Sequence, residues 1–130
     1  MSLSKKLMMK PDMRVGVLNA PEDYLDLLGE LPPGATLVTN REPGSLDLIL
    51  LFAKRLAELE LLAQQAISLV KYDGLFWIAY PKKSSKIKTD IDRDTGWAKM
   101  STIGYAGVAM VSMNDIWSAM RYRPAERVGK

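Results

Sequence analysis

Hydrophobic residues follow two different spacings along the chain, and each spacing predicts a different kind of element. Leu75–Tyr80 is an unbroken apolar and aromatic run that follows an Asp-Gly pair and stops at Pro81. A run of this length between turn residues is typical of a strand buried on both faces, which lies in the middle of a sheet. Leu46–Phe52 has a single polar residue, Asp47, near its start, and it is expected as a buried strand beside the first strand, Arg14–Leu18. A further short strand is expected at Ala35–Thr39.

Three segments show the spacing of a helix. The strongest spans residues 52–70, where apolar side chains recur at steps of three and four and polar ones fall on the other side. Leucines at positions 61, 62 and 69 widen its apolar arc, which favours burial against a sheet together with another helix or a second subunit. A second helix is expected from Pro21, and a third from Thr89, which opens a capping box.

The C-terminal part predicts an antiparallel hairpin. Val108–Met113 and Ile116–Arg123 are strand-like runs on either side of Asn114-Asp115, a pair that tolerates the positive φ of a tight turn. Before the hairpin, strands alternate with helices, and this alternation implies right-handed parallel crossovers. The predicted fold class is therefore α/β: a three-layer αβα sandwich with a mainly parallel Rossmann-like sheet and a C-terminal antiparallel hairpin. The 130 residues are expected to form one domain, with residues 1–10 and 124–130 as flexible tails.

A lysine-rich loop directly follows the central strand. In an open α/β sheet, ligands bind at the carboxyl ends of the strands, and ammonium groups beside hydroxyls bind phosphate or carboxylate. The pattern therefore predicts a site for a small anionic ligand, with Asn19 close by across the sheet edge. A solvated, lysine-rich surface is the alternative explanation. The predicted contact residues of the loop are Lys82, Lys83, Ser84, Ser85 and Lys86.

The turn after the first strand lacks the features of a nucleotide-binding loop. It contains no glycine, Pro21 removes a backbone donor, and the carboxylates of Glu22 and Asp23 repel phosphate. These residues argue against classical dinucleotide binding. Their charge is compatible with a cationic or neutral ligand such as S-adenosylmethionine.

Composition removes several kinds of chemistry. The chain has no cysteine and no histidine, which excludes disulfides, thiol nucleophiles, the usual zinc sites and histidine-activated nucleophiles. Asp90-x-Asp92-x-Asp94 is similar to the opening of a calcium loop, but Thr95 stands where that loop requires glycine, so helix capping explains the run better and no metal site is predicted. No run approaches the length of a membrane span or a signal peptide, which predicts a cytoplasmic protein without a membrane partner.

The positive charge of the chain lies in its second half. Residues 1–70 hold 7 basic and 9 acidic side chains, whereas residues 71–130 hold 11 and 6, within a net charge of +3. This asymmetry leaves nucleic-acid binding open as a third function. It is the least favoured one, because base stacking requires aromatic side chains exposed among the lysines, and Trp77 is expected to be buried in its strand.

Several motifs resemble a known family along nearly the whole chain. The chain resembles a family of small uncharacterised bacterial proteins, a domain of unknown function. This resemblance implies no established activity, so no catalytic residues are assigned. More distantly, the order of elements resembles a truncated S-adenosylmethionine-dependent methyltransferase core with its terminal antiparallel hairpin. The family resemblance rests on Asn19-Ala20-Pro21, Trp77-x-x-Tyr80-Pro81-Lys82-Lys83, Thr89-Asp90 with Arg93-Asp94, and Asp115-x-Trp117-Ser118-Ala119-x-Arg121.

Taken together, the sequence favours a binding domain over an enzyme. We expect a non-catalytic cytoplasmic domain that binds a protein partner or a small anionic ligand, takes no cofactor and forms a homo-oligomer. The alternative is a degenerate or minimal transferase that uses S-adenosylmethionine or a nucleotide, with Asn19 and Glu42 near the cofactor.

Overall fold

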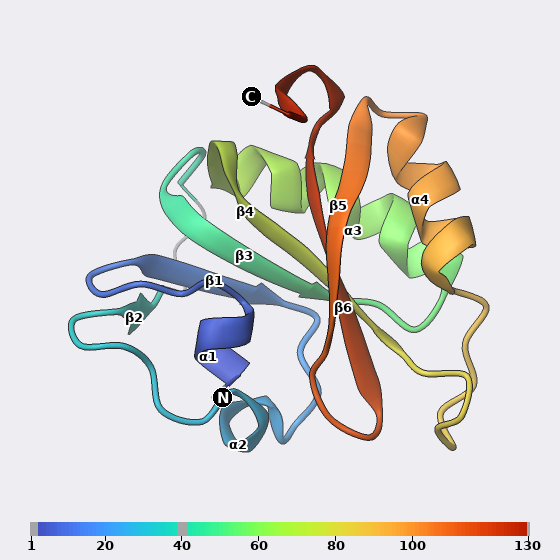
Figure 1. The fold of residues 1–130 in the computed structure, drawn as a ribbon, viewed down its shortest axis with the longest axis horizontal. Helices are drawn as coiled ribbons and strands as arrows, with labels where there is room; N and C mark the ends of the chain where they lie inside the picture. The colour runs from blue at the N-terminus through green and yellow to red at the C-terminus, as the bar shows by residue number, and fades with distance from the viewer. Residues whose placement is uncertain (1–2, 39–41, 130) are drawn as a thin grey trace.

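The computed structural model describes residues 3–38 and 42–129 of the chain. All of its strands belong to one six-stranded sheet, against which the helices pack (Figure 1). Along the chain the elements are α1 (Leu3–Lys6), β1 (Arg14–Leu18), α2 (Tyr24–Leu28), β2 (Thr36–Leu37), β3 (Leu46–Phe52), α3 (Leu56–Leu69), β4 (Val70–Pro81), α4 (Arg93–Ser101), β5 (Tyr105–Ser112), β6 (Trp117–Pro124) and the 3₁₀ helix η1 (Ala125–Arg127).

The strand order in the sheet is β2-β1-β3-β4-β6-β5. The first four of these strands are parallel to one another, while β6 is antiparallel to both β4 and β5. β3 and β4 lie in the middle, and Leu50 is paired with Trp77. The predicted fold class, a mainly parallel sheet with a C-terminal antiparallel hairpin, is confirmed.

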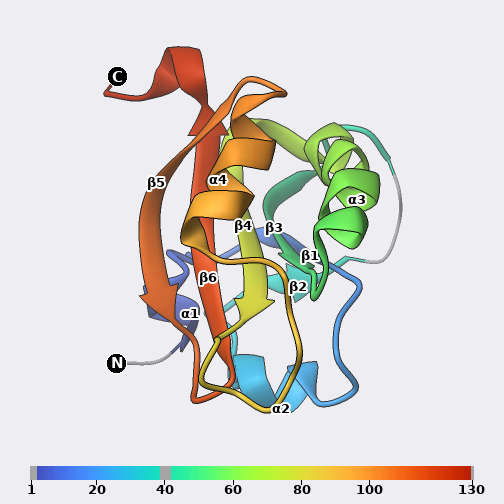
Figure 2. The ribbon, with the colours of Figure 1, turned by 90° about the vertical axis from the view of Figure 1, so that its right-hand side faces the viewer.

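Helices cover both faces of the sheet, which gives three layers (Figure 2). On one face, α3 contributes Leu59, Ala63 and Ala66 to a core that also includes Met100 of α4. The other face is covered by the short helices α1 and α2 and by the segment after α1, and Leu28 belongs to its core. β3, which is apolar except for Asp47, meets both cores because its successive side chains point to opposite faces.

The N-terminal segment is folded onto the sheet. Leu7 is fully buried, and its backbone carbonyl accepts a hydrogen bond of 2.9 Å from the indole N–H of Trp77. Because an indole N–H in a core needs an acceptor, this contact fixes the segment at the centre of β4. The expectation of a flexible tail over residues 1–10 is therefore corrected for the part that the structure describes.

Several element boundaries differ from those that the sequence predicts. β4 begins at Val70 rather than Leu75, directly after α3, and its pairing with β3 is shifted between Leu46 and Leu48. α3 begins at Leu56, so Phe52 belongs to β3 alone. The short strand expected at Ala35–Thr39 is β2, and position 39 lies outside the described residues. None of the helices in the described ranges is long and apolar enough to cross a membrane.

Candidate functional site

The order of strands reverses between β1 and β3. From β1 the chain crosses to β2 on one side, and it then returns to β3 on the other side of β1. In open α/β sheets, ligands bind at the carboxyl ends of the strands at such a reversal. A cavity of about 120 Å³, here called the switch cavity, lies at this place. It is lined by Asn19, Ala20, Pro21, Phe52, Ala53, Lys54, Glu58 and Trp117.

Asn19 holds the two strands of the switch cavity together. It follows β1 directly and has a backbone φ of 56°, a left-handed conformation that asparagine tolerates better than most residues. Its side-chain amide donates two hydrogen bonds of 2.9 Å, one to the carbonyl of Phe52 at the end of β3 and one to Oε2 of Glu58 in α3. The amide nitrogen of Asn19 therefore has two internal partners.

Glu58 is the carboxylate of the switch cavity. Burial by itself raises the pKa of this carboxyl, but hydrogen bonds from the backbone of Lys54, the Asn19 amide and the backbone of Arg55 outweigh burial, so the pKa lies below its usual value. The two backbone bonds to Oε1 measure 2.9 and 3.2 Å and cap the start of α3. Glu58 is consequently a fixed negative charge at neutral pH.

The first half of the lysine loop lines a second, larger cavity beside β4. Lys82, Lys83 and Ser84 face this space of about 570 Å³. The ammonium of Lys82 donates a hydrogen bond of 2.6 Å to the Ser112 hydroxyl of β5. The carboxylates of Asp92 and Asp94 also line this cavity, so its lining has both positive and negative charges. The remaining lining residues are Tyr80, Arg93, Met110 and Ser118.

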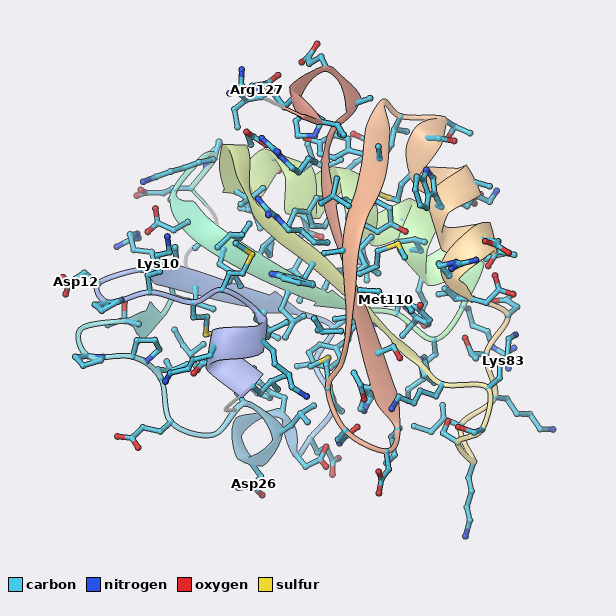
Figure 3. The ribbon with its side chains drawn as sticks, in the orientation of Figure 1. Lys10, Asp12, Asp26, Lys83, Met110 and Arg127 are labelled. Atoms are coloured by element: carbon cyan, nitrogen blue, oxygen red, sulfur yellow. The ribbon has the colours of Figure 1, made fainter. Side chains whose placement is uncertain are left out.

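The second half of the loop lines a groove of about 400 Å³, here called the cation groove. Ser85 stabilises the loop from within, because its hydroxyl donates to the Lys82 carbonyl at 2.8 Å and accepts from the Ile87 amide at 3.3 Å. Figure 3 shows Lys83 on this loop, on the opposite side of the view from Lys10. The lining residues of the groove are Arg55, Lys83, Ser85, Lys86, Ile87, Lys88 and Thr89.

The structure therefore distributes the predicted site residues over three spaces. Asn19 lines the switch cavity, and no residue of the lysine loop lines that cavity with it. Lys83 lines both the larger cavity and the cation groove, so these two spaces are neighbours. Glu42 stands in the loop before the amino end of β3, where the backbone of Ser45 donates to its carbonyl. The expectation that Glu42 and Asn19 lie near one cofactor is wrong, because they stand at opposite ends of the sheet.

Arg55, Glu58 and Trp117 line these spaces but are not among the site residues that the sequence predicts. Arg55 and Glu58 fall within the predicted 52–70 helix, whereas the structure places a turn over Ala53–Arg55 ahead of α3. Trp117 reaches the switch cavity because its ring meets the ring of Phe52 edge to face, with centroids 5.0 Å apart. The available signal is the acidic residue Glu58 three positions after the N-cap Arg55, the place of a capping carboxylate.

The acidic run of the lysine loop caps helices, as the sequence predicts. Asp90 Oδ1 accepts from the backbone N–H of Leu56 at 2.7 Å, and Asp92 Oδ1 accepts from that of Thr95 at 2.8 Å. Both bonds satisfy N–H groups that the first turn of a helix leaves without partners. In the described part of the chain, no group of three or more acidic side chains could hold a metal ion.

Comparisons with known proteins connect this architecture to methyltransferases. No protein-family model and no curated protein matches the chain. Among solved structures, the chain is similar to a SAM-dependent methyltransferase from Aquifex aeolicus, with 12% identity, a TM-score of 0.59 and coverage of 91% of this chain and 85% of that one. The chain has a methyltransferase-like Rossmann fold. The resemblance to a family of uncharacterised bacterial proteins stays a prediction.

Two further solved structures are also similar. The fibrillarin pre-rRNA processing protein of Methanococcus jannaschii has 16% identity, a TM-score of 0.48 and coverage of 88% of this chain and 68% of that one. The phosphoethanolamine N-methyltransferase 2 of Haemonchus contortus, in complex with S-adenosyl-L-methionine, has 14% identity, a TM-score of 0.49 and coverage of 98% and 39%.

The methyltransferase-like fold contradicts the expectation that the chain takes no cofactor. The Aquifex protein that shares the fold is named for its dependence on S-adenosylmethionine, and this finding overturns that expectation. The residues at the switch cavity fit a cationic ligand, because Glu58 supplies a fixed carboxylate. The left-handed turn at Asn19 also gives the sharp change of direction after β1 without a glycine.

Proposed function

We propose that the chain binds S-adenosylmethionine at the switch cavity and acts as a minimal transferase with this cofactor. The observation that carries the proposal is the place of the cavity. It lies at the carboxyl ends of β1 and β3, where the strand order reverses, in a fold similar to that of a SAM-dependent methyltransferase. The fold supports this transferase more than the non-catalytic domain that the sequence favours.

The charges around the cavity select this cofactor over a nucleotide. Glu58 lines the cavity, and Glu22 and Asp23 are exposed just beyond its proline. Negative charges repel the phosphates of a nucleotide and attract the cationic sulfonium of S-adenosylmethionine. A nucleotide-dependent transferase is therefore the weaker form of the same proposal.

Three polar residues of the cavity have a part in holding the ligand. Glu58 faces a cationic group, the Lys54 side chain is placed for an anionic one, and Asn19 keeps Glu58 in position. Because about 120 Å³ is below the roughly 300 Å³ at which typical small-molecule sites begin, the cavity receives one end of the ligand and the rest lies along the open edge of the sheet. When bound, the cofactor supplies an electrophilic methyl group.

Isothermal titration with S-adenosylmethionine and with its demethylated product tests the proposal. We expect saturable binding of both, and a melting temperature that rises by several degrees at about a hundred times the dissociation constant, where the stabilisation is roughly 2.7 kcal/mol. Ala20 lines the cavity and is exposed, so Ala20→Arg fills its mouth and adds a repelling cation. This variant should weaken binding at least about tenfold.

Ala98→Arg is the matched control. Ala98 is exposed on α4 and lines none of the cavities described above, so the same substitution there should leave the affinity unchanged. Absence of binding by the unaltered protein would contradict the proposal. Binding of ATP in place of the sulfonium ligand would replace it with the nucleotide-dependent form.

A further inference from the structure

The cation groove gathers four positive side chains from two separate parts of the chain. Lys83, Lys86 and Lys88 come from the loop between β4 and α4, and Arg55 comes from the turn before α3. The other lining residues are Ser85, Ile87 and Thr89, so no carboxylate lines the groove. The groove is therefore a concentration of positive charge that the sequence shows only in part, because Arg55 is 28 residues away from Lys83.

The protein itself compensates these four cations only in part, because Asp92 attracts Lys83 at longer range. Within residues 3–38 and 42–129, none of the four forms an ion pair. Asp90 and Asp92 follow them in the chain but do not line the groove, and one oxygen of each carboxylate accepts a hydrogen bond at a helix cap, from Leu56 and Thr95. Mutual repulsion among the four cations is unfavourable, and an anionic ligand would relieve it.

The loop that presents the cations has a defined shape. The Ser85 hydroxyl bridges the Lys82 carbonyl and the Ile87 amide, and the Lys83 ammonium reaches the Thr89 carbonyl at 3.3 Å. The bond from Leu56 to Asp90 ties the far end of the loop to the start of α3, next to Arg55. A positioned set of donors binds an anion at a lower entropic cost than four independent surface chains.

We propose that the cation groove is a binding site for a small polyphosphate, a ligand that carries two or more adjacent phosphate groups. The four positive charges exceed the charge of about −2 that a single phosphate carries, and the volume of about 400 Å³ accommodates a chain of such groups. No aromatic side chain lines the groove, so it lacks the stacking surface that single-stranded nucleic acid requires. This site is separate from the switch cavity, and the proposal does not rest on binding of S-adenosylmethionine.

Titration with inorganic tripolyphosphate tests the site. The unaltered protein should bind it saturably at low ionic strength and bind orthophosphate much more weakly. Lys86 is exposed, and Lys86→Glu reverses one of the four charges without removing any of the hydrogen bonds that shape the loop, so the affinity should fall at least about tenfold. Arg55→Ala should weaken binding several-fold in the same direction. Circular dichroism should show an unchanged fold for both variants.

Lys10→Glu controls for overall charge. Lys10 is exposed and lies on the opposite side of the molecule from Lys83 in Figure 3, and this variant changes the net charge by the same amount as Lys86→Glu. It should retain the affinity for tripolyphosphate. Equal losses in the two variants, or no binding by the unaltered protein, would overturn the proposal. Tighter binding of a single-stranded oligonucleotide than of tripolyphosphate would also overturn it, in favour of nucleic acid. Ala20→Arg, which blocks the switch cavity, should leave tripolyphosphate binding intact.

Discussion

Asn19 stabilises the carboxyl edge of the sheet through both its backbone and its side chain. The left-handed φ of 56° disfavours residues with an ordinary Cβ, while the amide bonds Phe52 and Glu58. The two contributions can be separated, because glycine accepts the backbone conformation but has no amide, whereas alanine has neither advantage.

We therefore predict that Asn19→Gly lowers the free energy of unfolding by about 1 kcal/mol and that Asn19→Ala lowers it by about 1 kcal/mol more. Urea unfolding of the three proteins under one set of conditions measures both differences. Equal losses for glycine and alanine would show that the backbone at this position is not left-handed.

At the residue scale, the sequence does not predict the internal partners of the site residues. Asn19 is predicted to contact a ligand, and this stays a prediction, but its amide nitrogen also joins two elements that are 33 and 39 residues further along the chain. Ser85 was expected among the ligand donors, and its hydroxyl is used inside the loop. Such partners depend on which segments meet in space, and no local pattern of residue types records that.

At the element scale, Asp73 connects three elements that end near one another. It lies in β4 with a φ of 58°, and its carboxylate accepts two hydrogen bonds of 2.9 and 2.8 Å from Arg123 of β6. Arg127 of η1 approaches the same carboxylate at 3.4 Å. The hydrogen bond from Arg123 holds the pKa of Asp73 below its usual value, burial opposes this shift, and Arg127 adds to it.

Because the pKa of Asp73 is depressed in the folded state, its stabilising effect is complete above the ordinary carboxyl pKa and is lost as pH falls through the lower folded value. We predict that Asp73→Asn lowers the urea midpoint at pH 7 and that its difference from the unaltered protein shrinks steadily below about pH 4. Asp26→Asn, at an exposed carboxylate of α2, should give a curve parallel to that of the unaltered protein. A constant gap for Asp73→Asn at all pH values would contradict this assignment.

The segment around Asp73 shows why the sequence predicts the start of β4 at the wrong residue. Asp73-Gly74 has the composition of a turn, so the sequence starts the strand at Leu75. In the structure the strand starts at Val70, and the pair occupies an irregularity within it, where the register with β3 shifts. A turn and a bulge use the same residue types, since both need a backbone with positive φ. Only the pairing with β3 distinguishes them.

At the scale of the whole molecule, periodicity was sufficient for the fold class but not for the shape of the site. The apolar runs and helix spacings predict the strands, the crossovers and the hairpin, because burial on one or two faces dictates each pattern. The reversal of strand order between β1 and β3 and the separation of the lysine loop from Asn19 come from the sheet topology.

The homo-oligomer stays a prediction. Leu61, expected to widen the apolar arc of the long helix, has 77% of its surface exposed.

The positive charge of the C-terminal half is divided between distant surfaces. The cations of the lysine loop lie at the carboxyl edge of β4, whereas Arg123 and Arg127 share Asp73 near the other end of that strand. Figure 3 shows Lys83 and Arg127 well apart. Nucleic-acid binding that depends on released counterions requires many cations along one continuous path that the phosphate backbone can follow. Because the cations are divided between two distant surfaces, each surface can contact only a few phosphates.

We therefore predict no retardation of a 20-nucleotide RNA or of duplex DNA by micromolar protein near physiological salt, about 0.15 M. At several-fold lower salt, any residual binding should depend on Lys86 but not on Arg127, since Arg127 already approaches a carboxylate. Gel retardation with Lys86→Glu and Arg127→Glu over a salt series measures this. The contradicting result would be an affinity that declines steeply with salt and that both variants lower equally. It would show that the two basic surfaces act as one, whereas Lys83 and Arg127 lie well apart.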